Sequence, residues 1–588
     1  MASTFLTLSQ PRDAVAAMNF IEELTKNACL VQDQVLEEIL KRNANTEYLK
    51  QFLNGKLDKE SFKEKVPVVD YEDISPFIER IANDSNQSSK SSLTAEPIVE
   101  LFRSSGTSGG RHKLFPVTNE ELNRRCLFNN LSLGVLKTHI HGLDDGKRMV
   151  FFSVVHGIKT TSGLIEINAL SGIYKDQKSK THPLNVFNNL TSPDDVISCT
   201  DRKQNIYMQL LCGLVQRDQV VSVGAHFPPT LIRAMKFLQK NWEELCSNIR
   251  TGLISDWITD PSGRKATSTI LSKEMPDLAN TIEEIYRGKS WEGIIKKLWP
   301  KAKMIQTKVT GSIAQYIPIL EFYGGGLPLV SMKYTCSECS IGINLKPLSK
   351  PSDILYTLMP NMAYFEFIEI YQQGNTEMSQ KVVDLSSLKI GQQYELVVTT
   401  STGLYRYRVG DILMVIGFHN NTPQFRFLQR KNVILSIHFD KTTEEDLFKA
   451  IRKAMEILEP LGFSLHDYTS YNETSLKLGH YVLFWELQHA EKIIVELDAF
   501  VMEKCCALLE QSLDIMYKKV RNMNDVIGPL EIKVVKQGTF DALMDFYLSQ
   551  DSSSTQYKTP RTIKSEKALK ILNTMVIGSY SSKTIPNI

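Results

Sequence analysis

The sequence has few cysteines, no long apolar run and no excess of one charge. Only 9 of its 588 residues are Cys, too few and too scattered for a disulfide scaffold, so we expect a reduced, cytoplasmic protein. No run of about 18 apolar residues occurs, and no helix is therefore expected to cross a membrane. The first residues lack a basic stretch followed by an apolar core, so we expect no secretory signal.

The charges nearly cancel. Lys and Arg number 68, Asp and Glu number 66, and the net charge is +2. Nucleic acids and anionic membranes select strongly basic surfaces, so this balance predicts neither kind of partner. Hydrophobic residues make up 42% and charged residues 23%, which is typical of a globular protein. At about 100–200 residues per domain, the length allows two to four domains.

The N-terminal part contains both helical and strand patterns. Apolar residues recur three or four positions apart over residues 14–42, which predicts a helix. The same spacing over 230–249 predicts another helix, with Thr230 as its N-cap. Residues 320–418 instead contain short β-rich segments broken by Gly or Asp, which predict strands. We therefore expect an α/β protein.

The C-terminal part follows a plan of its own. A capping-box pattern, Thr443-Glu-Glu-Asp446, starts its first predicted helix. We predict a domain boundary after residue 430, which separates an N-terminal domain, 1–430, from a smaller α+β domain, 431–588. The other elements predicted there are a strand over 481–487, a helix over 499–520 capped by Asp498, a strand over 530–535 and a helix over 540–548.

The first motif is a Gly/Ser-rich segment, Ser104-Ser-Gly-Thr-Ser-Gly-Gly110. Glycine allows the backbone to wrap around a phosphate, and Ser and Thr hydroxyls donate hydrogen bonds to phosphate oxygens. The segment has no Gly-Lys-Ser/Thr ending and is therefore not a Walker A loop. It predicts a phosphate-binding loop, although the same composition is also typical of a flexible surface loop.

The second motif is Tyr334-Thr-Cys-Ser-Glu338, directly after a predicted apolar strand. A carboxylate at the end of a strand is well placed to hold a metal ion or to order a phosphate. Cys336 and Cys339 form a Cys-x-x-Cys pair, but no second Cys/His pair with ligand spacing follows, so we do not expect zinc.

Two further segments each carry one charged residue of interest. Tyr405-Arg-Tyr-Arg-Val-Gly-Asp411 predicts a strand that ends at a tight turn, where the Asp411 carboxylate can accept both hydroxyls of a ribose. Lys558 follows a Ser-rich segment, and a lysine on a mobile terminal loop can neutralise negative charge that develops in a cleft. Taken singly, an exposed turn Asp and a solvated surface Lys are the alternative interpretations.

In this order the motifs resemble those of adenylate-forming enzymes. More closely, the chain resembles the plant acyl acid amido synthetases of the Gretchen Hagen family, over about residues 20–570. The segments that carry the resemblance include SSGTSGG, TSPDDVI, LLCGLVQRD, NWEELCSNI, LMPNMAYFEF, GLYRYRVGD, NVILSI, DKTTEEDL, GPLEIKVVKQGTFD and QYKTPR. The resemblance implies a luciferase-like α/β fold with β-sheets and a barrel-like part in a large N-terminal domain, and a smaller α+β lid domain.

The resemblance also implies a reaction. Such enzymes use ATP and Mg²⁺ to convert a small carboxylic acid to an acyl-adenylate and then join it to an amino acid, which releases AMP. It implies an indole-type or benzoate-type hormone acid and a monomeric enzyme. The residues implied to bind the nucleotide are Ser104, Ser105, Thr107, Thr310, Gly311, Ser312, Tyr334, Ser337, Glu338 and Asp411. The residues implied in catalysis are Glu338, which would support Mg²⁺ indirectly, Lys441 and Lys558.

The acyl pocket departs from the family pattern. Benzoate-using relatives have an Arg where this chain has Ser132, and many members have Ala-Arg where it has Glu166-Ile167. Ser132 removes a possible bidentate clamp for a carboxylate. The expected acyl-site residues are Leu131, Ser132, Leu164, Ile167, Asn168 and Leu170, although the apolar ones are equally typical of a core. The alternatives are an inactive or weak paralogue that binds nucleotide or acid without turnover, and an acyl-CoA ligase.

Overall fold

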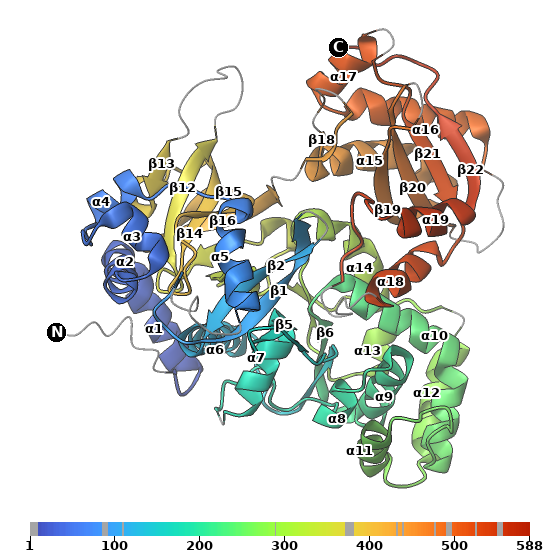
Figure 1. The fold of residues 1–588 in the computed structure, drawn as a ribbon. Coiled ribbons are helices and arrows are strands. Elements are labelled where there is room, and N and C mark those ends of the chain that lie inside the picture. The colour runs from blue at the N-terminus through green and yellow to red at the C-terminus, as the bar shows by residue number, and fades with distance from the viewer. Residues whose placement is uncertain are drawn as a thin grey trace. The chain divides into compact units, whose positions relative to one another are not determined.

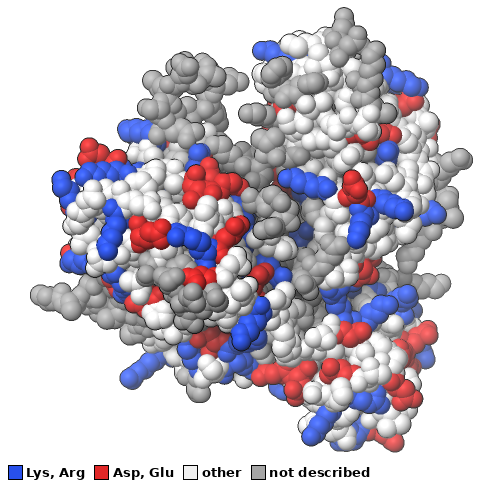
Figure 2. Space-filling view, viewed as in Figure 1, with Lys and Arg blue, Asp and Glu red and all other residues white. Residues whose placement is uncertain are grey.

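The structure, a computed structural model, falls into two compact units, one ending at Leu428 and the other beginning at Gln429 (Figure 1). Each unit has a hydrophobic core of its own. The residues described are 10–84, 92–108, 111–180, 182–288, 290–370, 381–430, 433–437, 440, 442–475, 478–489, 497–523, 526–549 and 557–588. Lys and Arg are intermixed with Asp and Glu on the face shown in Figure 2. Among the described residues, no helix is long and apolar enough to cross a membrane.

The helix predicted over 14–42 is two helices, α1 (Ala14–Lys26) and α2 (Ala28–Asn43). They are separated by Asn27, whose side-chain amide and backbone N–H both donate to the carbonyl of Glu23. Asn competes in this way for helix carbonyls and favours helix ends, which the apolar spacing does not reveal. Three more helices follow before the first strand: α3 (Glu47–Leu53), α4 (Lys59–Lys65) and α5 (Tyr71–Asn83).

The first sheet has the order β2-β1-β5-β4. It contains β1 (Ile98–Ser108), β2 (Arg111–Thr118), β4 (Ile158–Lys159) and β5 (Ile165–Asn168), and β1 pairs antiparallel with β2 and parallel with β5. The described residues of the Gly/Ser-rich motif, 104–108, therefore belong to β1 and do not form a loop that starts at Ser104. Helix α7 (Ala169–Lys178) follows β5 and is capped by Asn168, whose side chain accepts from the Ser171 N–H at 2.9 Å.

A parallel sheet of order β3-β6-β7-β8 forms the second layer of the first unit. Its strands are β3 (Lys147–Phe151), β6 (Val220–Ala225), β7 (Ile305–Gln306) and β8 (Leu329–Val330), and every residue of β6 is buried, as expected for a parallel strand covered on both faces. The helices along this part of the chain are α8 (Asp194–Ile197), α9 (Arg202–Val215), α10 (Pro228–Thr251), α11 (Pro261–Leu271), α12 (Pro276–Arg287), α13 (Ile294–Leu298) and α14 (Ile317–Gly324).

The predicted cap of the long helix was wrong. Helix α10 begins at Pro228, with Phe227 at the N-cap position, and Thr230 lies inside its first turn. Proline is favoured at the first helical position because it has no N–H to leave unpaired and its φ angle suits the helix. The two consecutive prolines therefore begin the helix three residues earlier than the cap pattern predicted.

An eight-stranded sheet of order β13-β12-β14-β15-β16-β11-β10-β9 completes the first unit. Its longest strand, β15, runs without interruption through the Gly-Asp pair that predicted a turn. The bounds are β9 (Lys333–Thr335), β10 (Ser340–Ile343), β11 (Tyr356–Leu358), β12 (Tyr364–Ile370), β13 (Val382–Asp384), β14 (Gln393–Thr399), β15 (Tyr407–His419) and β16 (Thr422–Arg430).

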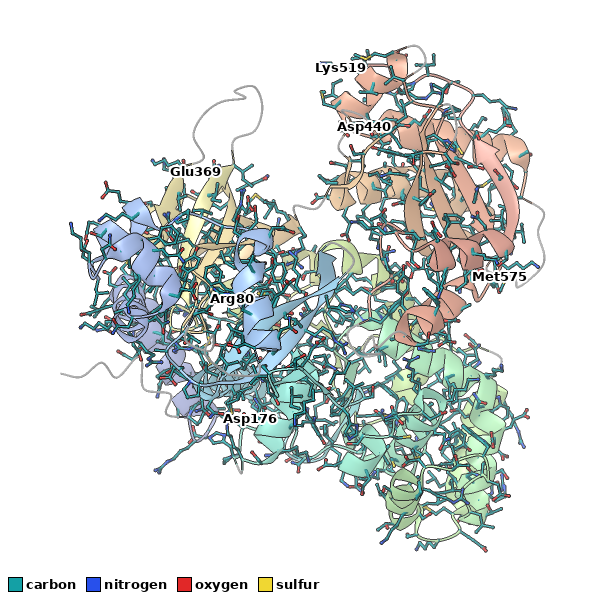
Figure 3. All side chains as sticks on the ribbon, viewed as in Figure 1. Arg80, Asp176, Glu369, Asp440, Lys519 and Met575 are labelled. Atoms are coloured by element: carbon teal, nitrogen blue, oxygen red, sulfur yellow. The ribbon has the colours of Figure 1, made fainter. Side chains whose placement is uncertain are left out.

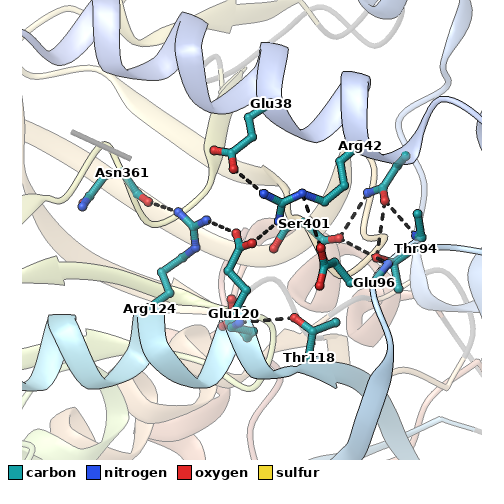
Figure 4. A network of polar contacts seen from close by, with 12 residues as sticks. Glu38, Arg42, Thr94, Glu96, Thr118, Glu120, Arg124, Asn361 and Ser401 are labelled. Atoms are coloured by element: carbon teal, nitrogen blue, oxygen red, sulfur yellow. Dashed lines mark hydrogen bonds and ion pairs between the residues drawn. The ribbon is translucent and has the colours of Figure 1, made fainter. Parts of the chain in front are cut away.

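Helix α6 (Asn119–His139) is enclosed by the rest of the first unit. Every residue from Arg124 to Leu136 is buried, so the helix has no solvent face that would give it an amphipathic pattern. Its first turn is tied to α2, since Glu120 pairs with Arg42 and accepts from Arg124 at 2.7 Å, and Arg124 also donates to the carbonyl of Asn361 (Figure 4). These contacts fix α6 in position and rotation.

The second unit is an α+β unit built on the sheet β19-β20-β21-β22. The capping box at Thr443 and Asp446 is confirmed, and it starts α15 (Glu444–Leu458). The buried Asp440, labelled in Figure 3, accepts from the N–H of Ile437. The strands are β17 (Val433–Leu435), β18 (Thr442–Thr443), β19 (Phe463–Glu473), β20 (His480–His489), β21 (Glu531–Val535) and β22 (Val576–Ser581).

The single helix predicted over 499–520 was wrong, because the structure has α16 (Ala499–Ser512) and α17 (Ile515–Asn522). The first helix ends at Ser512, and Leu513 is extended. Asp514 caps the second helix by accepting from the N–H groups of Met516 and Tyr517 at 2.7 and 3.1 Å. The predicted cap Asp498 is present and accepts from Phe500 at 2.7 Å. The remaining helices are α18 (Thr539–Ser549) and α19 (Glu566–Thr574).

Candidate functional site

Two residues from separate sequence motifs meet in the first unit. The hydroxyl of Tyr334 on β9 donates to Oδ2 of Asp411 on β15 at 2.7 Å. Tyr334 is 8% exposed and Asp411 is 5% exposed, so the hydrogen bond lies in a shielded region. The ring of Tyr334 also lies beside those of Tyr356 and Phe427, with ring centroids 5.8 and 5.7 Å away. The aromatic contacts and the hydrogen bond together fix the direction of the Asp411 carboxylate.

A β-bulge, and not a turn, places Asp411. The β14–β15 register pairs Arg408 with Val397 but Ile412 with Glu395, so β15 has extra residues between the two pairs. Gly410 lies in this stretch with φ at +81°, a conformation that glycine adopts without strain. A bulge re-aims side chains within a strand. The expected tight turn was therefore wrong, as was the alternative of an exposed Asp, because Asp411 is a buried strand residue.

The turn between β9 and β10 carries Ser337 and Glu338. It closes by a hydrogen bond of 3.0 Å from the Cys336 N–H to the Cys339 carbonyl, and both cysteines are free thiols. The Cys336 thiol also donates to that carbonyl at 3.4 Å, and its contact with Cys339 and its burial raise its pKa well above the usual range. Cys336 and Cys339 thus shape a turn that presents Glu338, which is 6% exposed.

Arg125 on α6 holds this turn by hydrogen bonds, and no sequence motif predicted it. Its guanidinium donates to the carbonyls of Cys336 and Ser337 at 3.2 and 2.8 Å and to Glu121 at 2.7 Å. It also lies over the ring of Phe102 on β1, 5.4 Å from the centroid. Arg125 therefore joins β1, α6 and the Glu338 turn. The available signal was an Arg pair, 124–125, in a helix without an amphipathic stripe.

The Gly/Ser-rich motif lies at the end of the β1–β2 hairpin. The hairpin register pairs Thr107 with His112, and the ring Nδ1 of His112 lies 3.1 Å from the carbonyl oxygen of Ser104. The side chains of Ser105 and Thr107 lie outside the described part of the structure. The hairpin brings the motif onto the strand that contains Phe102, and through Arg125 this strand is linked to the turn that carries Glu338.

The segment 310–312 borders the Tyr334 pair. Thr310 contacts the hydroxyl of Tyr356 at 3.3 Å, and Tyr356 is a ring neighbour of Tyr334. Gly311 has φ at +68°, and a Cβ there would lie 2.6 Å from the ring of Phe427, so only glycine fits. The Ser312 side chain is outside the described residues. This segment, Tyr334 and Asp411 therefore lie close together in the structure.

The acyl-site residues are divided among separate clusters. Leu131 and Leu164 belong to the main core, and Ile167 packs in a smaller cluster with Phe102. Leu170 borders another cluster, beside Phe152 and Tyr174. Ser132 is buried on α6, and Asn168 is the buried cap of α7 with its side-chain nitrogen unpaired. Leu131, Leu164 and Ile167 are thus packed core positions.

Lys558 belongs to the second unit, and Lys441 lies outside the described residues. The Lys558 side chain is exposed, whereas its neighbours Tyr557 and Thr559 are buried. Thr559 donates to Asp467 on β19 at 2.6 Å, and Arg561 donates to the same carboxylate at 2.8 Å. The residues that follow Lys558 are therefore bonded to the sheet.

No group of three or more metal-ligating side chains occurs in the described ranges. Mg²⁺ keeps several water ligands and is commonly bound through one or two carboxylates together with the phosphates of a substrate. A single carboxylate such as Glu338, presented by a braced turn, fits that mode of binding.

Comparison with known proteins relates this architecture to a family. The GH3 family N-terminal, central and C-terminal domains match residues 17–329, 356–430 and 445–567. The chain is 50% identical to the indole-3-acetic acid-amido synthetase GH3.17 of Arabidopsis thaliana, over 98% of both chains. It is 47% identical to the 4-substituted benzoates-glutamate ligase GH3.12 of the same plant, over 96% of this chain and 97% of that one.

A solved structure supports the same relationship. The AtGH3.15 acyl acid amido synthetase in complex with 2,4-DB matches with a TM-score of 0.90 and 48% identity, over 98% of this chain and 99% of that chain. Fold and relatives define an acid–amino-acid ligase of mixed α/β architecture. The chain belongs to the GH3 family. The resemblance, the fold class and the ligase class predicted from the motifs are confirmed.

Proposed function

We propose that this enzyme activates a small aromatic or indole acid with ATP and Mg²⁺ and joins it to the amine of an amino acid. The hydrogen bond between Tyr334 and Asp411 carries the proposal, because it fixes a shielded carboxylate beside the segment 310–312. A shielded, oriented carboxylate is suited to the two hydroxyls of a ribose, since hydrogen bonds to charged groups contribute about 1.5–3 kcal/mol.

The reaction has two steps. An oxygen of the acid attacks the α-phosphate of ATP, and the bond to pyrophosphate breaks. The amine of the amino acid then attacks the acyl carbon, AMP leaves with the bonding electrons, and the amine loses a proton. Mg²⁺, when bound, neutralises the phosphate oxygens. Glu338 would hold it through water, and Arg125 keeps the Glu338 turn in place.

The acid is proposed from the relatives and the pocket together. The relatives named above are an indole-3-acetic acid-amido synthetase and a 4-substituted benzoates-glutamate ligase. Ser132 cannot form the bidentate contact of an Arg at that position. An indole acid therefore suits this chain better than a benzoate that depends on such a clamp.

The second unit is proposed to act as a lid in a cytoplasmic, monomeric enzyme. Lys558 would approach the phosphates while the adenylate forms, and Lys441 would approach the nucleotide in a second orientation. Lid movements that exclude water protect reactive intermediates such as an acyl-adenylate. An exposed lysine on a bonded segment is suited to this role, because its backbone is already ordered.

Pyrophosphate release tests the proposal. Purified enzyme with ATP and Mg²⁺ is offered indole acids, benzoates and jasmonate, each with pooled amino acids or with CoA. We expect release that depends on an indole acid, together with an amide product. Thioester formation with CoA would favour an acyl-CoA ligase. ATP binding without release for any acid would identify an inactive paralogue and reject the proposal.

A further inference from the structure

A cavity of about 490 Å³ lies in the first unit at the start of β3. Its walls include the last turns of α6, the first two residues of β3 and the segment 183–194. Ligands of parallel α/β sheets bind beyond the carboxyl ends of the strands. This cavity lies at the amino end of β3, so it is distinct from the site expected of such a sheet.

The cavity wall has more positively charged than negatively charged side chains. Lys137 pairs with Asp144 at 2.7 Å, and Lys178 pairs with Asp194 at 2.9 Å. The wall has two further cations, Lys147 and Arg148, and no further carboxylate. The lining therefore has an excess of two positive charges.

Neither extra cation has a carboxylate partner among the described residues. Lys147 donates to the amide oxygen of Gln216, and Arg148 donates to the Val186 carbonyl at 2.8 Å. The Nε of Arg148 is buried with no hydrogen-bond partner. A buried guanidinium donor without a partner is costly, because it has lost its water without replacement. Burial also lowers the pKa of Arg148 to about 10.

A third cation adds to the local positive potential. Lys333 donates to Asn129 on α6 at 2.7 Å and has no carboxylate partner in the described ranges. Its pKa is lowered to about 8, chiefly by burial and also by the charge of Arg148. Asn129 is one turn of α6 away from Leu133, which lines the cavity. Cations that are shielded together repel one another, and an anion between them would relieve that repulsion.

We propose that this cavity binds a small oxyanion, a carboxylate or a phosphate group, through Lys147 and Arg148. Asn189, Thr191 and Ser192 also line the wall, and residues of these types carry N–H or O–H groups that donate hydrogen bonds to oxyanions. The assignment goes beyond the proposed ligase reaction and does not depend on it. Because Leu133 and Leu136 belong to both the cavity wall and α6, an occupant would also contact the helix that carries Arg125.

Calorimetric titration tests the proposal. The full-length enzyme is saturated with AMP, which occupies the nucleotide site, and is then titrated with inorganic phosphate or with succinate at low ionic strength. We expect saturable binding of at least one of them, weakened at least tenfold by Lys147→Gln and by Arg148→Gln. The exposed Lys301→Gln is the control and should bind as the wild type does. Tighter binding of phosphate would indicate a phosphorylated ligand, and tighter binding of succinate a carboxylate ligand.

The proposal is overturned if neither anion binds saturably, or if Lys147→Gln binds as tightly as Lys301→Gln. Because Arg148→Gln can disturb folding, thermal unfolding of the wild type is measured as well. Phosphate or succinate should raise the melting temperature above that in sodium chloride of equal ionic strength. An equal melting temperature in all three salts would also reject the site. Failure of the ligase proposal would appear instead as absent pyrophosphate release, with anion binding intact.

Discussion

At the scale of single residues, the hydroxyl of Tyr334 is the most direct test of the nucleotide site. Tyr334→Phe removes the hydrogen bond to Asp411 and keeps the ring contacts. A hydrogen bond to a charged group contributes about 1.5–3 kcal/mol, so we expect kcat/KM for ATP to fall roughly 10- to 100-fold. Steady-state pyrophosphate release at varied ATP measures the effect.

The matched control for this variant is Tyr394→Phe. Tyr394, on the neighbouring strand β14, is also a buried tyrosine, and its hydroxyl accepts from the Lys389 N–H at 3.1 Å. We expect similar melting temperatures for the two variants and an ATP dependence that changes only in Tyr334→Phe. An unchanged KM for ATP in Tyr334→Phe would remove Asp411 from the ribose site.

Arg125 is expected to position the Glu338 turn and not merely to stabilise the fold. Arg125→Met leaves Glu121 buried and unpaired, and burial already raises the pKa of Glu121. Breaking a buried ion pair on one side costs about 3–5 kcal/mol. The double variant Arg125→Met with Glu121→Gln should recover most of the stability but not kcat. Recovery of kcat together with the melting temperature would make the role of Arg125 purely structural.

The charge of Lys333 should lower the free energy of unfolding at neutral pH, because the side chain is shielded from water. Its pKa is about 8 in the folded protein against 10.5 for a free lysine, so the unfolded chain binds more protons between these values. Stability therefore rises as the pH increases from about 8 to 10.5, and the cost of burying the charge is fully present below that range. In anion-free buffer, Lys333→Met should stabilise by about 1–3 kcal/mol at pH 7, and the gain should shrink by pH 10. Urea unfolding of both proteins at pH 7 and pH 10 measures the stabilisation. A stabilisation that is the same at both pH values would contradict the prediction.

At the scale of secondary structure, local chemistry explains which predictions were confirmed. The start of α15 was predictable because its capping box is a pattern of adjacent residues. The breaks at Asn27 and Leu513 were missed because apolar spacing continues across them. The bulge at Gly410 was missed because it depends on the partner strand β14, which no local pattern specifies.

The residues of the candidate site also differ in whether a local pattern predicts them. Tyr334, Glu338 and Asp411 lie in short motifs, so the sequence alone could propose them as site residues. Arg125 donates to backbone carbonyls more than 200 residues away, and its only local signal is the Arg pair 124–125 in a helix without an amphipathic stripe. The apolar acyl candidates were ambiguous because hydrophobic residues serve pockets and cores equally, and three of them are core residues in the structure.

The capping box itself gives a prediction at this scale. Thr443→Ala removes the side chain that accepts from the Asp446 N–H and should destabilise the start of α15 by about 1 kcal/mol. Hydrogen exchange of the first α15 amides should become roughly fivefold faster. The control Thr281→Ala lies inside α12, where Ala is a good helix former, and should not speed exchange there. Equal exchange at α15 in Thr443→Ala and wild type would contradict the cap.

At the scale of the whole molecule, the chain has two units with separate cores, and the nucleotide candidates other than the two lysines lie in the first. If the second unit acts as a lid, Lys558→Ala should slow pyrophosphate release about 100-fold, because one group that stabilises developing charge contributes this much. AMP affinity, measured by calorimetry, should stay unchanged. The exposed Lys570→Ala is the control, and equal rates in both variants would reject the role of Lys558.

The contacts of Thr559 and Arg561 with Asp467 have a kinetic consequence. They attach the backbone that follows Lys558 to β19, so the base of this side chain is held to the sheet. A side chain attached to a rigid unit moves with the rate constant of the movement of that unit. If the second unit acts as a lid, the approach of Lys558 in rapid-mixing experiments should follow a single exponential, shared with a fluorescent label elsewhere on the same sheet.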